Sequence, residues 1–107
     1  MKVEIFYGHP YDIADSINSW LSENPKIVVE ELDGAERQAN ATIYAWYTTQ
    51  RKLPEKMHVK VFYSNPLQGD QEINMWIADN PRVVIKDRVV MSNFGGIAVF
   101  ILYTTPR

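Results

Sequence analysis

The chain has no cysteine among its 107 residues. This absence excludes a disulfide scaffold, a thiolate zinc site and a cysteine nucleophile, so packing must supply the stability. No apolar run approaches membrane-spanning length, and the first residues, MKVEIFY, lack the charged start and apolar stretch of a secretory signal. We therefore expect a cytoplasmic protein with no membrane partner.

Positive charge is not in excess either. The formal net charge is −2, with 11 Lys or Arg against 13 Asp or Glu. Binding to duplex DNA needs a broad basic surface that neutralises phosphates, so we expect no such partner. The length and the 46% apolar composition fit one compact domain.

An internal duplication is the clearest positive feature of the sequence. A shift of 56 residues aligns residues 1–51 with residues 57–107 without a gap, and only the polar linker 52–56 lies outside the repeat. Identical residues recur in register: Val3 and Val59, Phe6-Tyr7 and Phe62-Tyr63, Ile17-Asn18 and Ile73-Asn74, Trp20 and Trp76, Asn24-Pro25 and Asn80-Pro81, Tyr47-Thr48-Thr49 and Tyr103-Thr104-Thr105. Chance would not keep that register.

Each copy predicts a strand, a helix and two further strands. The spacing of Ile13, Ile17, Trp20 and Leu21 is that of one buried helical face, and Asn24-Pro25 ends the helix. In the second copy Gly69 replaces Ile13, so its helix is weaker. Polar residues followed by Pro10 and Pro66 start the helices, and Gly34 and Gly95-Gly96 lie in the connections between strands. The predicted strands are residues 2–7, 26–32, 41–48, 58–63, 82–90 and 97–104.

The sequence therefore predicts an α+β fold. It consists of tandem duplicated β-α-β-β units, with six mainly antiparallel strands and two helices, related by a pseudo-two-fold within a single domain.

Alternation along the strands separates two sides of the predicted sheet. Val3, Ile5 and Tyr7 share one side, which we expect to carry the helix, as do Val59, Val61 and Tyr63 in the second copy. The other side is also apolar, which predicts that it is covered by the other half, by another chain or by a ligand. This second side would present Phe6, Val28, Glu30, Tyr44 and Trp46, and then Phe62, Val84, Lys86, Arg88, Phe100 and Leu102. We expect a homodimer or a higher homo-oligomer, with Phe6, Tyr44, Trp46 and Leu102 at the interface.

Charge is divided unequally between the copies. Residues 1–50 hold three Lys or Arg and eight Asp or Glu, a net charge of −5, whereas residues 51–107 hold eight and five, a net charge of +3. Two interpretations stay open: complementary charge favours docking of halves or of chains head-to-tail, or the basic half holds an anion.

Catalytic signals are weak throughout the chain. We find no nucleophile beside a base, no phosphate loop and no metal-ligand spacing, and we expect neither an enzyme nor a cofactor or metal. The group of His9, Asp12 and Asp15 offers too few ligands for a zinc site. Both acidic residues suit the first turn of a helix. Asn18 and Asn74 fit a repeated structural hydrogen bond better than a ligand contact.

The one sharp ligand hypothesis is a group of basic and aromatic residues in the second half. Basic side chains neutralise phosphate while aromatic rings stack on bases, as in nucleotide sites. The group comprises Lys60, Arg82, Lys86 and Arg88 with Phe62 and Phe100. Strand positions of this kind also suit solvated edges or salt bridges.

Three segments of the first copy share a pattern with a known family. They are Lys2-Val3-Glu4-Ile5-Phe6, Asp12-Ile13 with Ile17-Asn18-Ser19-Trp20-Leu21, and Ile43-Tyr44-Ala45-Trp46-Tyr47. In these segments the first copy resembles the small sporulation proteins of endospore-forming bacteria. The resemblance covers about fifty residues at a time and implies a strand-helix-strand-strand outline rather than an activity.

Two functions follow as hypotheses, both of them non-catalytic. The first is a bacterial or phage binding module that sequesters a small anionic, nucleotide-like signalling molecule between halves or subunits. The second is a protein-interaction or sporulation-associated adaptor that docks through its aromatic second side.

Overall fold

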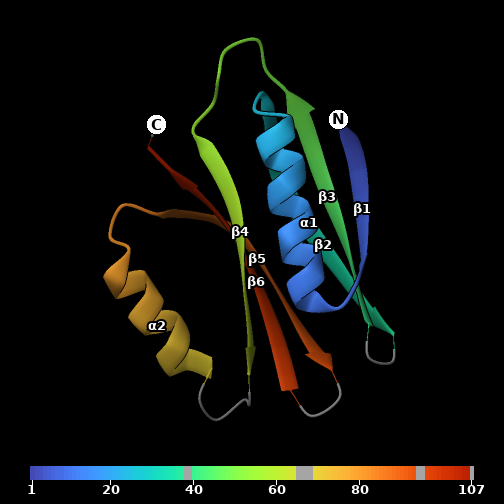
Figure 1. Cartoon of the computed structure of the whole chain (residues 1–107), viewed down its shortest axis with the longest axis vertical. Coiled ribbons are helices and arrows are strands. Elements are labelled where there is room, and N and C mark those ends of the chain that lie inside the picture. The colour runs from blue at the N-terminus through green and yellow to red at the C-terminus, as the bar shows by residue number, and fades with distance from the viewer. Residues whose placement is uncertain (38–39, 65–68, 94–95, 107) are drawn as a thin grey trace.

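The computed structural model describes residues 1–37, 40–64, 69–93 and 96–106. The first half of the chain forms β1 (Lys2–Gly8), α1 (Pro10–Glu23), β2 (Ile27–Arg37) and β3 (Asn40–Thr49), and the second half forms β4 (Lys56–Ser64), α2 (Gly69–Asp79), β5 (Val84–Asn93) and β6 (Gly96–Thr105). This order confirms the α+β fold of two β-α-β-β units (Figure 1).

The six strands form two antiparallel sheets of three strands, in the orders β1-β3-β2 and β4-β6-β5. Their registers agree at the offset of 56, since Phe6 pairs with Ile43 and Phe62 with Val99. The irregularities agree as well, because β2 shifts register after Val29 and β5 after Ile85. The duplication seen in the sequence is therefore a duplication of structure, down to a β-bulge.

Each helix packs on its own sheet through the repeated tryptophan. The ring of Trp20 lies 5.5 Å from that of Phe6 and 5.0 Å from that of Tyr47, between centroids. Trp76 repeats these contacts at 5.7 Å and 5.0 Å with Phe62 and Tyr103. We call this surface of each sheet its helix side and the opposite surface its far side.

The start of α1 follows from its local sequence. Gly8 has a φ of +144°, which side-chain-bearing residues rarely adopt, and it lets β1 turn into the helix. The main-chain N–H of Tyr11 then donates to Nδ1 of His9, and Pro10 stands at the first helical turn. His9 is thus a helix cap. The corresponding start in the second half, at Asn65 and Pro66, lies outside the described residues.

Two expectations about the strands are wrong. Gly34 lies inside β2, which continues to Arg37, and does not form a connection. The far side of the first sheet carries Val3, Ile5 and Tyr7. These residues alternate along β1 with Phe6, which contacts Trp20, and so they point to the side away from α1. The helix side carries Phe6 instead.

The core lies between the two halves. The helix side of the first sheet and α1 together pack against the far side of the second sheet. The six strands therefore do not form one continuous sheet. The buried residues of this layer include Ile17, Leu32, Ile43, Val59, Phe100 and Leu102, all at most 3% exposed. In the second half this far side carries Val59 and Val61, which were expected to face their own helix, and the first half covers it. The predicted second side is divided, because Phe100 and Leu102 lie in this covered layer whereas Phe62 packs on α2.

The contacts between the halves are one-sided. Helix α1 rests on β4 as well as on its own sheet, and β2 lies against β5. A two-fold relation would place α2 on β1 in the same way, but α2 packs on β4 and lies on the opposite side of the molecule from β1 (Figure 1). The two repeated units therefore meet through different surfaces.

Candidate functional site

The structure separates the basic and aromatic group that the sequence suggested. Phe62 lies on the helix side of the second sheet, whereas Phe100 lies on its far side and is completely buried. Lys86 and Arg88 do not share a side, because the β-bulge between Ile85 and Asp87 interrupts the alternation. Only part of the expected group remains together.

Three of its members share the helix side of the second sheet. Lys60 pairs with Ile101, which in turn pairs with Arg88, so the two cations flank one apolar residue. The Lys60 ammonium lies 5.6 Å from the centroid of the Phe62 ring. Arg82 follows α2 and is exposed. Lys60 and Arg88 are exposed to solvent, so their electrostatic attraction for an anion is weak.

Lys86 lines a different feature, a pocket of roughly 370 Å³ between the halves. The pocket lies under the linker, with Met57 and Glu55 on one wall and Val29 and Thr104 on others. Thr104 is 4% exposed, and its hydroxyl is the buried side-chain oxygen that finds no partner within the described residues. A buried hydroxyl without a partner is unfavourable, so this pocket offers a polar anchor to a ligand.

A second pocket, of roughly 340 Å³, lies on the other side of Met57. Its walls come from the end of α1 and the start of β4, and His58 is one of them. Burial, followed by the neighbouring Lys56 ammonium, lowers the pKa of His58, and burial raises the pKa of Tyr103, whose ring stacks 5.2 Å from that of His58. Both effects favour the neutral forms in this corner.

The far side of the first sheet carries exposed apolar residues. Val3, Ile5 and Tyr7 of its edge strand β1 are 38%, 53% and 66% exposed. The same side carries Tyr44 and Trp46, which pair with Ile5 and Val3. We call these five residues the free sheet face.

A second set of exposed apolar residues belongs to α2 and to β5 on the helix side of the second sheet. No residue of α2 is buried, in contrast to α1. Ile77, Ile85 and Val90 are 37%, 41% and 63% exposed. We call these three residues, together with Asn74 and Arg88, the free helix face.

The predicted interface residues divide between the core and the surface. Phe6 and Leu102 lie in contacts within the chain, whereas Tyr44 and Trp46 belong to the free sheet face. Trp46 donates its indole N–H to Asp33 at 3.0 Å, which fixes its ring on this face. The sequence led us to expect that the halves dock, but the residues of the pockets beside Met57 were not predicted, because they depend on which surfaces of the two halves meet.

A metal site would require a cluster of ligands in the described parts of the chain, and a membrane span would require a long apolar helix there. No group of three or more His, Asp or Glu there could hold a metal ion. Neither of the two described helices is long and apolar enough to cross a membrane.

Searches against protein-family models, curated proteins and solved structures found no match to this chain. The functional argument therefore rests on the geometry of its own surfaces.

Proposed function

We propose that the chain is a non-catalytic binding module that docks a polypeptide on its free sheet face. One observation carries this proposal: the equivalent face of the second half is already a docking surface. Residues Val59 and Val61, the counterparts of Val3 and Ile5, are only 3% and 9% exposed beneath the first half.

The same contrast holds on the central strands. Phe100 and Leu102 are completely buried, while their counterparts Tyr44 and Trp46 are partly exposed. Exposed apolar surface of this extent, with aromatic residues, is typical of protein-binding sites. The resemblance to small sporulation proteins adds a sporulation-associated setting to the proposal.

Capture from cell extract tests the docking proposal. Immobilised wild-type chain should retain a polypeptide that Ile5→Arg loses, because an unpaired charge would be buried in the contact. Leu53→Arg is the matched control, since Leu53 is also 53% exposed but lies in the linker. A capture pattern that is the same for both variants would refute the proposed face.

A nucleotide-like anion in the pocket beneath the linker is the second candidate function. It is favoured by Lys86 and the unpartnered Thr104 hydroxyl, which line the same pocket. Pockets of this volume fit small ligands. Calorimetry with cyclic nucleotides and ADP-ribose should then give binding that Lys86→Ala and Thr104→Val weaken. Arg88→Glu should leave it unchanged, and a full panel without heat would exclude this candidate.

A further inference from the structure

We propose that the polypeptide docked on the free sheet face is a second copy of this chain, joined head-to-tail through its free helix face. The inference rests on the proposed function and names its partner. It follows from the repeat. Inside the chain, the helix side of the first half packs on the far side of the second half. The free helix face and the free sheet face are the counterparts of these two surfaces.

The interface inside the chain has a defined anchor. The Asn18 side chain of α1 accepts a hydrogen bond from the main-chain N–H of Val59 at 2.7 Å and donates one to its carbonyl oxygen at 2.9 Å. Val59 belongs to β4, an edge strand of the second sheet. The asparagine amide thus occupies the main-chain groups that a further strand would use.

Within the residues that the structure describes, the counterparts of this anchor do not make the corresponding contact. The repeat places Asn74 on α2 where Asn18 stands on α1, and Asn74 is exposed. It places Val3 on β1, the edge strand of the first sheet, where Val59 stands on β4. One molecule therefore carries, in its described parts, an asparagine amide on α2 that bonds no strand edge, and on its opposite side a strand edge at β1 that no amide bonds (Figure 1).

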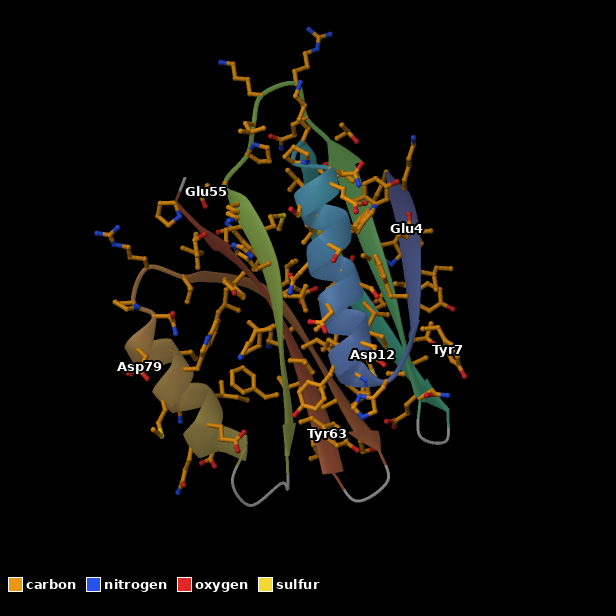
Figure 2. The ribbon with its side chains drawn as sticks, viewed as in Figure 1. Glu4, Tyr7, Asp12, Glu55, Tyr63 and Asp79 are labelled. Atoms are coloured by element: carbon orange, nitrogen blue, oxygen red, sulfur yellow. The ribbon has the colours of Figure 1, made fainter. Side chains whose placement is uncertain are left out.

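Aromatic residues near the anchor repeat this relation. The ring of Tyr63 lies 6.1 Å from that of Tyr11 at the start of α1, so it is part of the interface between the halves. Its counterpart Tyr7 lies at the outer edge of β1, on the rim of the molecule (Figure 2). Tyr7 is 66% exposed and is thus positioned to meet an added helix.

The large and the small residue of one contact inside the chain change places on the two free faces. A Cβ atom on Gly34 would lie 2.5 Å from Cε of Met91 and 2.6 Å from Cγ1 of Val89, so glycine fits there because methionine faces it. At the counterparts Val90 replaces the glycine and Ala35 replaces the methionine. A larger residue on one free face is matched by a smaller residue on the other, as close packing requires.

Charges are matched in the same way. Leu32 is buried between the halves, and its N–H donates to the Asp87 carboxylate at 2.7 Å. The counterpart of Leu32 is Arg88, and the counterpart of Asp87 is Glu31. Docking by the same relation places Arg88 of one copy beside the Glu31 carboxylate of the next. The net charges of −5 and +3 on the two halves favour the same encounter.

The geometry requires head-to-tail addition rather than a symmetric pair. Each chain offers one free sheet face and one free helix face, and these surfaces are different. Heterologous contacts of this type close into a ring or continue as a filament. The contact between the two halves of one chain is then repeated between each chain and the next.

Two blocked variants test this arrangement. Ile5→Arg disables the free sheet face and Ile77→Glu the free helix face, where the counterpart of Ile77 is the buried Leu21. Light scattering should show wild type and the control Leu53→Arg as assemblies, and each blocked variant as a single chain of 12.4 kDa. An equimolar mixture of the blocked variants should form a species of one chain of each, because one intact face of each kind remains.

This complementation also proves that both variants are folded, and a chain that carries both changes should stay single in every mixture. A symmetric pair made by Ile77→Glu alone, a mixture that stays unpaired, or a wild type that is a single chain up to millimolar concentration overturns the inference. In the last case, capture of another polypeptide that Ile5→Arg abolishes leaves the proposed function standing. If the wild type neither assembles nor captures a polypeptide, the inference and the proposed function are both overturned.

Discussion

At the scale of single residues, the repeat sets up a comparison that few proteins offer. Asn18 and Asn74 occupy the same position in the two helices, but only Asn18 bonds a buried strand edge, through Val59. Asn18→Ala should leave two buried main-chain groups without partners and lower the free energy of unfolding by about 2 kcal/mol. Asn74→Ala, the matched control, should change it little in dilute solution. Urea unfolding measures both, and equal losses would contradict the assignment.

Gly34 and Met91 allow a test of packing between the halves. Gly34→Val overfills the contact, which costs about 1–3 kcal/mol, and Met91→Ala alone leaves a cavity. The double variant reproduces the Val90 and Ala35 combination of the free faces, so the two losses should partly cancel. A double-mutant cycle on unfolding free energies should give a favourable coupling of about 1 kcal/mol or more. Simple additivity would mean that the two sites do not share one space.

His58 gives the chain a pH dependence of known sign. Burial and the Lys56 ammonium lower its pKa below 6.5, so the unfolded chain binds the proton more readily than the folded chain. This contribution to stability is complete above the unfolded pKa of about 6.5 and is lost as the pH falls toward the lower folded pKa. Between about pH 7.5 and pH 5.5, the denaturation midpoint should fall more in the wild type than in His58→Gln. Parallel curves would remove His58 as the cause.

At the scale of elements, the sequence predicted what local periodicity determines. The helical spacing around Trp20 and the pairing of strands at an offset of 56 were both confirmed. The side of β1 that meets the helix was predicted wrongly, since Phe6 and Ile5 lie on opposite sides and both are apolar. Alternation distinguishes two sides but cannot say which one packs on a helix when neither is polar. The bulges that separate Lys86 from Arg88 have no local signal of this kind.

The two helices differ in what covers them, and this difference predicts their dynamics. Helix α1 lies between two sheets, whereas α2 has no buried residue. Amides of α2 should exchange with deuterium faster than those of α1 in the single-chain Ile5→Arg variant, because few apolar contacts oppose local opening. In the wild-type assembly the α2 amides should become protected to the level of α1. Unchanged α2 exchange on assembly would show that this helix is not in the contact.

At the scale of the whole molecule, composition predicted the kind of surface but not its position. The charge division between the halves was visible in the sequence, and so were Tyr44 and Trp46 as residues of an apolar surface, but alternation grouped them with Phe6 and not with Ile5. What could not be predicted is the stacking of one helix side on one far side. This choice buries Phe100 and Leu102, exposes Tyr44 and Trp46, and creates the pockets beside Met57. It depends on contacts between residues far apart in the chain.

Charge reversal tests the contact between chains separately from the apolar faces. Arg88→Glu opposes a new carboxylate to Glu31 of the next copy, and it should weaken assembly by about 10- to 100-fold in dissociation constant. Glu31→Arg in the same chain restores opposite charges across every contact, because each interface takes Arg88 from one copy and Glu31 from the other. Assembly of the double variant should therefore recover, with a salt dependence like that of the wild type. Sedimentation at low and high salt measures all three chains, and a double variant weaker than Arg88→Glu alone would place these residues outside the interface.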